Sequence, residues 1–319
     1  MGFNISYFMY FVLSLAISVS LGPVLIPYLK KLKFGQTIRE EGPKSHYIKT
    51  GTPTMGGVMF LIAILVSFLI SRRFSSNAVF VISALFGFGI IGFIDDFKKI
   101  VLKRSLGLRA YEKIILQFIV AIALSVYHTK TSQLGTYINM PFMENNFNMA
   151  FLYMPFLLIV FIASTNSVNL TDGLDGLASG VTIIATMSLS LIAMKLGFVD
   201  ISLIGLIICG GCLGFLYYNK YPAKVFMGDT GSLALGGAFA AMAIRINMPF
   251  LIPIVGFIYF LESISVILQV SSFKLFKKRI FKMSPIHHHF ELCGWKETKV
   301  VLLFYIITLV MSFVGYYSI

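Results

Sequence analysis

The carboxylates with the clearest chemical potential stand in short motifs at the ends of apolar runs. Asp95 and Asp96 are adjacent and precede two lysines, and Asp229 lies in a Gly-Asp-Thr-Gly sequence before another apolar run. Adjacent carboxylates repel one another unless a cation shares them. A hard divalent cation such as Mg²⁺ binds carboxylate and phosphate oxygens together, so these motifs are typical of a phosphate held through a metal. The alternatives are a helix end marked by mixed charges for the pair and a helix cap for Asp229.

A further acidic motif, from Asn166 to Gly176, combines amides, carboxylates and glycines. Asn166, Asn169 and Asp172 are three residues apart, so a continuous helix would place all three on one face. The glycines allow the chain to turn and a ligand to approach the backbone. Asp172 or Asp175 is alternatively the cap of the next helix. Because a cap requires only one of them, we expect a functional site.

Three consecutive histidines, His287, His288 and His289, lie near the C-terminal end of the chain. Three adjacent side chains do not readily converge on one tetrahedral metal, and no cysteine cluster accompanies them, so zinc is disfavoured. Hydrogen bonding to an anionic substrate is the preferred interpretation.

Basic and aromatic side chains near the acidic motifs suit the rest of a nucleotide-like ligand. Phe226, close to Asp229, is a candidate for stacking on a base, with membrane anchoring as the alternative. Lysines suit the remaining phosphate charge. The candidates are Lys49, Lys98, Lys99, Lys103 and Lys113.

The elements that must position these motifs are membrane helices. Of 319 residues, 57% are hydrophobic and only 12% are charged, and the mean hydropathy is +0.87. A soluble domain carries about 25% charged residues, so an ordinary soluble protein is excluded. Apolar runs of spanning length recur at 3–29, 54–70, 78–94, 113–130, 151–169, 177–194, 201–218, 231–246, 250–270 and 299–317. We predict an all-α integral membrane protein of about ten transmembrane helices, forming a single domain over residues 1–319.

Loop charges predict the orientation of these helices. Only five of the 26 lysines and arginines belong to one side of the predicted bundle, namely Arg72, Arg73, Lys130, Lys195 and Arg245. Basic residues accumulate in cytoplasmic loops, so we predict both termini outside and five cytoplasmic loops that form the active site. Every motif described above then reaches the cytoplasmic face. Because the net charge of +13 is concentrated where anionic lipid headgroups lie, the partner is the bilayer and no nucleic acid is expected.

Together, these motifs resemble the phospho-N-acetylmuramoyl-pentapeptide transferases, a branch of the polyprenyl-phosphate N-acetylhexosamine-1-phosphate transferase superfamily. The resemblance covers essentially the whole chain. It implies Mg²⁺-dependent transfer of phospho-MurNAc-pentapeptide from UDP-MurNAc-pentapeptide to undecaprenyl phosphate, giving lipid I and UMP in peptidoglycan synthesis. It also implies a location in the bacterial cytoplasmic (inner) membrane and allows a homodimer. The motifs that carry it, in chain order, are Gly51–Gly57, Asp95-Asp96, Asn169–Gly176, Phe226–Ser232 and Pro285–Glu291.

The resemblance also implies roles for individual residues. Catalytic roles fall on Asp229, which resembles the principal Mg²⁺ ligand, and on Asp95, which resembles the proposed base or nucleophile, with Asp96 beside it. Uracil stacking is implied for Phe226. The positions implied in binding the uridine and the rest of the substrate are Lys49, Lys113, Asn169, Asp172, Asp175, Phe226, His288 and His289.

Three other functions compete with this one. A related UDP-GlcNAc:polyprenyl-phosphate GlcNAc-1-phosphate transferase is disfavoured by the segments Gly51–Gly57 and Pro285–Glu291, which resemble the muramoyl-pentapeptide branch. A membrane prenyltransferase requires an Asp-x-x-x-Asp pair, which we do not find at the expected positions. An ion-coupled transporter requires ionisable residues at mid-membrane depth, and only Glu262 qualifies. We expect the segment 250–270 to break near Glu262 and to pack this residue inside the protein.

The motifs leave the reaction path open. A lipid phosphate attacking directly and a covalent aspartyl-phosphate at Asp95 are both compatible with the residues.

Overall fold

Helices account for nearly all of the structure. The computed structural model describes residues 5–31, 49, 51–102, 107–132, 135–143 and 146–319. Within them the long helices are α1 (Ile5–Lys31), α2 (Gly57–Ser71), α3 (Ser76–Val101), α4 (Ala110–Thr131), α5 (Tyr153–Thr171), α6 (Leu177–Lys195), α7 (Val199–Asn219), α8 (Gly228–Arg245), α10 (Phe257–Phe276) and α12 (Glu297–Tyr317). The shorter ones are η2 (Ala150–Leu152), η3 (Pro249–Leu251), α9 (Ile252–Val255) and α11 (Ile286–Leu292). Each apolar segment that the sequence singled out overlaps one of the long helices.

The lengths and compositions of these helices confirm an all-α membrane protein. Among the described residues, eight helices are long and apolar enough to cross a membrane, and they are α1, α3, α4, α5, α6, α7, α10 and α12. Helix α2 is also apolar but has only 15 residues. Helix α8 is glycine-rich and is buried along almost its whole length. It packs mainly against α3 and α5, so its surroundings are protein.

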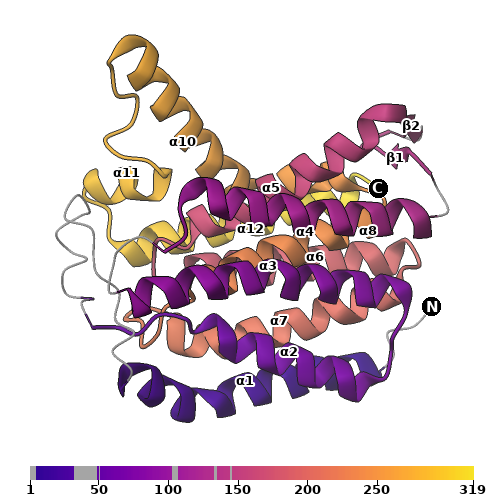
Figure 1. Cartoon of the computed structure of the whole chain (residues 1–319), viewed down its shortest axis with the longest axis horizontal. Coiled ribbons are helices and arrows are strands. Elements are labelled where there is room, and N and C mark those ends of the chain that lie inside the picture. The colour runs from indigo at the N-terminus through magenta and orange to yellow at the C-terminus, as the bar shows by residue number, and fades with distance from the viewer. Residues whose placement is uncertain (1–4, 32–48, 50, 103–106, 133–134, 144–145) are drawn as a thin grey trace.

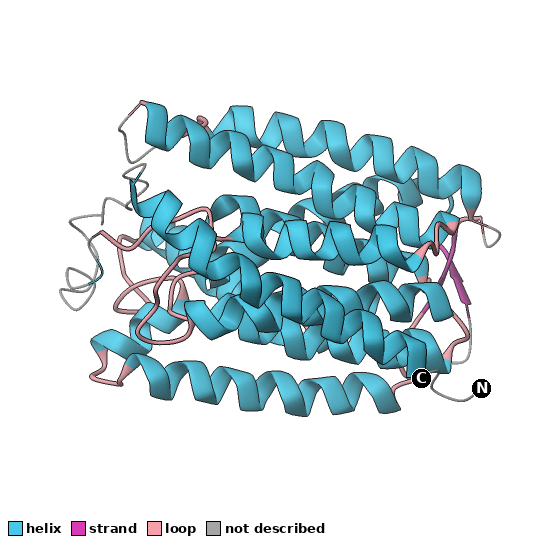
Figure 2. Cartoon of the chain, turned by 90° about the horizontal axis from the view of Figure 1, so that it is seen from below, coloured by secondary structure: helices cyan, strands magenta, loops and turns pink. Residues whose placement is uncertain are grey.

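The helices run roughly along one direction, and the connections gather at the two ends of the bundle (Figure 2). At one end lies a short antiparallel hairpin of β1 (Tyr137–Asn139) and β2 (Asn146–Asn148), with Ile138 opposite Phe147. The C-terminus lies at this hairpin end (Figure 1). The sequence did not predict the hairpin, because two three-residue strands give too short an alternating pattern to recognise.

The segment 250–270 departs from the predicted single helix. The chain forms η3 and α9, breaks at Gly256 and restarts as α10, which leans away from the bundle at the end opposite the hairpin (Figure 1). A break near Glu262 is therefore wrong in position, because Glu262 lies inside α10. Pro253 and Gly256 supply the reason, since proline removes a backbone donor and glycine favours a helix end. The second part of the expectation holds, because Glu262 is completely buried.

Candidate active site

The crossing of α3 and α8 brings together carboxylates that are more than 130 residues apart in the chain. Gly92 of α3 lies directly against the backbone of Asp229, and a Cβ atom at this position would collide with the Asp229 carbonyl group. Glycine therefore lets the two helices approach one turn before Asp95 and Asp96. Among the described residues, α3 and α8 share the most extensive contact of any two helices.

Asp95, Asp96 and Asp229 form what we call the acid cluster. One oxygen from each lies within 4.8 Å of the others. Asp95 and Asp96 are buried, and backbone groups fix both. The Leu108 amide donates to Asp95 Oδ1 over 2.8 Å. The amide and hydroxyl of Thr230 both donate to Asp96 Oδ2, over 2.9 and 2.8 Å. These contacts fix the orientation of the two carboxylates.

Two lysine side chains and the side-chain amide of Asn169 contact the acid cluster. Lys99 Nζ lies 2.6 Å from Asp95 Oδ2, 3.4 Å from Asp96 Oδ1 and 3.0 Å from Asp229 Oδ2. Lys113 Nζ lies 2.8 Å from the same Asp229 oxygen. Asn169 Nδ2 donates to Asp229 Oδ1 over 2.8 Å. Three side chains therefore contact the carboxylate of Asp229. The residue at the N-terminal cap of α8 is Met227, and its side chain makes no capping hydrogen bond.

The structure brings Lys113 and Asn169, which the sequence predicted to bind substrate, into contact with Asp229. It also gives Lys99 more contacts with the acid cluster than the sequence indicated. The sequence treated Lys99 only as one of several phosphate-binding candidates. Its spacing of four residues from Asp95 was the available signal, because this spacing places both side chains on one helix face. Of the other candidates, Lys98 pairs with Glu112 over 3.6 Å, and Lys103 lies outside the described residues.

Asp172 lies where the chain leaves α5, next to the acid cluster. Burial, together with the charges of Asp229 and Asp96, raises the pKa of the Asp172 carboxyl to about 7. The cap of α6 is Gly176, without a side-chain hydrogen bond. The alternative interpretation, in which Asp172 or Asp175 caps the next helix, is therefore wrong.

Lys49 and Asp175 form a second polar centre with Glu297, at the start of α12. Lys49 Nζ lies 2.7 Å from Asp175 Oδ1 and 2.6 Å from Glu297 Oε1. Glu297 also accepts the Asp175 amide over 2.7 Å, and Asp175 Oδ2 accepts the Ala223 amide over 2.9 Å. Burial lowers the pKa of Lys49, but the two carboxylates outweigh burial and raise it above its ordinary value. The sequence did not identify Glu297, which has no motif around it.

Phe226 belongs to a segment that is paired with the Gly51–Gly57 motif. The Phe226 amide donates to the Pro53 carbonyl over 2.8 Å, and the Gly56 amide donates to the Phe226 carbonyl over 2.8 Å. These backbone bonds place Phe226 three residues before Asp229, with its side chain partly exposed. Two motifs that the sequence could only treat separately are thus one structural unit.

The three histidines have different surroundings. His288 Nδ1 lies 2.9 Å from Glu291 Oε2 within α11, and His289 Nδ1 accepts the Lys282 amide over 3.1 Å. These two predicted substrate-binding residues are not held by the acid cluster. His287 is the buried one, with Nδ1 3.0 Å from Glu262 Oε1. Its ring packs on Gly173, where a Cβ atom would collide with it, so α10 and α11 are fixed against the α5–α6 turn.

We expect the His287–Glu262 pair to stabilise the fold. His287→Leu and Glu262→Leu should each lower the free energy of unfolding by about 3–5 kcal/mol, because each leaves a buried polar partner unpaired. The double variant should lose little more than either single variant. Unfolding of the detergent-solubilised protein measures all three, with His289→Leu as the control from the same helix. Additive losses would show that the two residues act independently.

The donor set of the acid cluster fits a divalent cation. Three carboxylates with oxygens within 4.8 Å of one another are the hard ligands that Mg²⁺ prefers. The ammonium group of Lys99 contacts one oxygen of each of these carboxylates, so the acid cluster accommodates positive charge.

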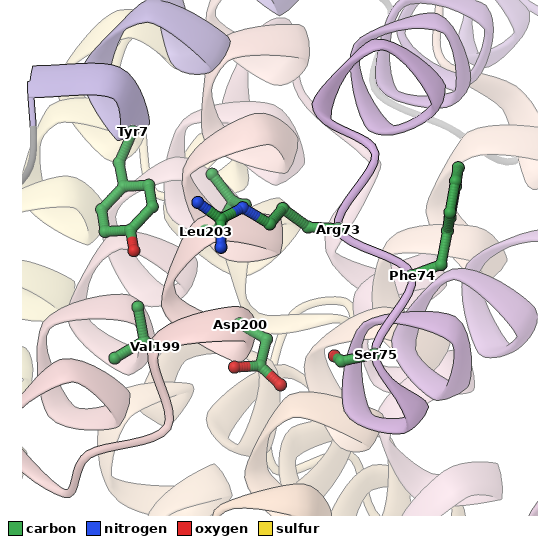
Figure 3. A pocket seen from close by; sticks show the side chains of 7 residues that line it. All are labelled: Tyr7, Arg73, Phe74, Ser75, Val199, Asp200 and Leu203. Carbon is green, nitrogen blue, oxygen red and sulfur yellow. The ribbon is translucent and has the colours of Figure 1, made fainter.

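A separate pocket of about 190 Å³ lies at the start of α1 and α7 and the α2–α3 connection. Figure 3 shows Tyr7, Arg73 and Asp200 around it. None of the predicted site residues lines it, so we place the candidate active site at the acid cluster.

Comparison with known proteins shows the family of the chain. Residues 77–247 match the family model of glycosyl transferase family 4, and residues 49–61 match phospho-N-acetylmuramoyl-pentapeptide-transferase signature 1. A phospho-N-acetylmuramoyl-pentapeptide-transferase of Acetivibrio thermocellus is 52% identical over 322 residues, which cover 99% of this chain and 96% of the relative. The chain belongs to the phospho-N-acetylmuramoyl-pentapeptide-transferase family.

Other transferases of this family are equally similar along nearly the whole chain. The one from Caldanaerobacter subterraneus is 51% identical over 306 residues, covering 96% of each chain. One from Clostridium botulinum is 51% identical over 302 residues, covering 94% of this chain and 93% of the relative. The family signature spans Lys49 and the Gly51–Gly57 motif, which is the segment bonded to Phe226. The family's own signature therefore lies beside the acid cluster.

Proposed function

We propose that this protein transfers phospho-MurNAc-pentapeptide from UDP-MurNAc-pentapeptide to undecaprenyl phosphate, giving lipid I and UMP. The observation that carries the proposal is membership of the transferase family at about 50% identity over nearly the full length. The acid cluster with its two lysines supports it, because a diphosphate requires both a metal site and additional positive charge.

We place all ten long helices across the bacterial cytoplasmic membrane as one domain, with both termini outside and the acid cluster on the cytoplasmic face. The distribution of basic residues supports this orientation. A soluble nucleotide substrate and a lipid substrate can then meet at the membrane surface.

The acid cluster would hold Mg²⁺, with Asp229 as the principal ligand and Asp95 and Asp96 beside it. When bound, Mg²⁺ supplies charge neutralisation of the diphosphate and stabilises the leaving nucleotide phosphate. Lys113 and Lys99 lie at the same oxygens and provide additional positive charge for the phosphates. Asn169 holds Asp229 and also donates to Ser232 Oγ, so we assign it a positioning role.

We favour direct attack by the lipid phosphate over a covalent intermediate. The second pKa of a phosphate monoester is about 6, so the attacking group is already mostly a dianion at neutral pH and requires no general base. Both oxygens of Asp95 are engaged, one by the Leu108 amide and one by Lys99. A nucleophilic Asp95 would have to use the oxygen that Lys99 contacts, because the Leu108 amide holds the other. UMP exchange into the nucleotide substrate without lipid phosphate would instead support the covalent path.

The uridine end of the substrate is assigned to the segment that carries Phe226, with Asp172 close by. Asp175 and Lys49 are bonded to Glu297 and would fix the surrounding loops. His288 and His289, on α11, are proposed to contact the part of the substrate that projects away from the metal site.

The experiment that tests the function is a transfer assay on the purified protein in detergent. UDP-MurNAc-pentapeptide and undecaprenyl phosphate should give UMP and a new lipid product, and both should depend on Mg²⁺. UDP-GlcNAc in place of the muramoyl donor should give no product. Product from UDP-GlcNAc alone would assign the protein to the sister transferases, and ion flux in liposomes without UMP release would favour a transporter.

A further inference from the structure

The ammonium group of Lys99 occupies the centre of the acid cluster. It lies within 3.4 Å of an oxygen from each of the three carboxylates, at 2.6, 3.4 and 3.0 Å. An ammonium has three N–H donors, so the three contacts use its full donor capacity. Lys113 differs, because it contacts only Asp229 among these three carboxylates.

A cation in this position offsets the negative charge of its buried neighbours. Asp95 and Asp96 are 3% and 2% exposed, and two adjacent buried carboxylates without a counter-charge are strongly disfavoured. Lys99 supplies that charge from its own helix, one turn beyond Asp95. A divalent metal bound to the same oxygens would lie within contact distance of the ammonium, and the two positive charges would repel one another. Contact of the ammonium with all three carboxylates and metal binding at the same oxygens therefore disfavour one another.

The side chain of Lys99 can also move from the acid cluster into solvent. The side chain of Lys99 is 31% exposed, whereas the side chains of Asp95 and Asp96 are only 4% and 2% exposed. The flexible stem of a lysine allows the charged group to move outward without moving the helix.

We propose that Lys99 is an internal counter-ion that exchanges with the divalent metal of the active site. In the metal-free protein its ammonium holds the three carboxylates together. Metal binding displaces the ammonium, which stays tethered beside the site and adds positive charge to its open side. This inference rests on the proposed function only in taking the acid cluster as the metal site.

Direct metal binding tests the exchange without turnover. Mn²⁺ binding is measured by electron paramagnetic resonance on the purified protein in detergent, without substrates. Lys99→Gln should bind Mn²⁺ about tenfold more tightly than the wild type, because the competing charge is gone. Lys98→Gln, the neighbouring exposed lysine paired with Glu112, should leave the affinity unchanged. Lys99→Arg should bind no more tightly than the wild type.

A measurement on the unmodified chain does not depend on how the variants fold. Acylation of Lys99 by an amine-reactive ester, read by peptide mass spectrometry, should increase several-fold when Mn²⁺ is added, whereas Lys98 should not change. Weaker or unchanged Mn²⁺ binding by Lys99→Gln, or acylation that does not respond to Mn²⁺, would overturn the exchange. Absence of Mn²⁺ binding to the wild type would overturn the metal site as well, and failure of the transfer assay with the exchange intact would overturn the function alone.

Discussion

An Asp229→Asn variant should lose transfer activity by about three orders of magnitude or more at ordinary Mg²⁺ concentrations. Asp229 accepts from Lys99 and Lys113 through one oxygen and from Asn169 through the other. An amide keeps only one acceptor, so its NH₂ group must face a donor. The substitution also removes one negative charge from the acid cluster, which weakens metal binding. UMP release over a Mg²⁺ titration measures both the loss of turnover and the weaker metal binding.

Asp200→Asn is the matched control, because this aspartate lines the pocket at the other end of the bundle. It should retain wild-type turnover. An Asp229→Asn variant with near-normal turnover at ordinary Mg²⁺ would move the principal metal ligand to Asp95 or Asp96.

A Gly92→Ala variant should lose activity by about 100-fold, although this residue has no side chain and touches no substrate. The added methyl group collides with the Asp229 backbone, so α3 and α8 must separate. Misplacing catalytic groups by about 1 Å can cost about 100-fold in rate, and overpacking costs about 1–3 kcal/mol of stability. Turnover and the thermal unfolding midpoint of the same preparation measure the two consequences.

Gly87→Ala is the control on the same helix. Its Cβ would meet a methyl group of Val120 at 2.9 Å, which is a side-chain atom and can shift. It should reduce activity and stability much less than Gly92→Ala. Equal effects of the two substitutions would mean that the α3–α8 contact does not set the geometry of the acid cluster.

The sequence was sufficient to predict a protein built of apolar membrane helices. Apolar runs and loop charges are local features, and they identify membrane helices because the bilayer allows few alternatives. The break was expected near Glu262, but it lies six residues earlier, at Gly256. The carboxylate is instead accommodated by His287, a partner 25 residues away that no local pattern reveals.

The pairing of charges within the site was the part that the sequence did not predict. Asp175 and Lys49 were assigned to substrate binding, yet they are joined through Glu297 from the start of α12. Contacts over more than 120 residues depend on how helices cross, and one sequence does not specify those crossings. For Lys99, the sequence did indicate one contact, because its four-residue spacing from Asp95 places both on one helix face. The sequence did not indicate that Asp229 would approach the same lysine.

The outward lean of α10 gives the molecule unequal cross-sections at its two ends (Figure 1). The far half of α10 exposes large apolar side chains, including Ile267, Phe273 and Phe276. With the helices across the bilayer as proposed, this outline would take up more area in one leaflet than in the other. We expect the lateral pressure of the lipids to act on the angle of α10, and through the His287–Glu262 contact on the α5–α6 turn at Gly173. The lipid composition of the bilayer should thus change the rate of transfer without any contact with the acid cluster.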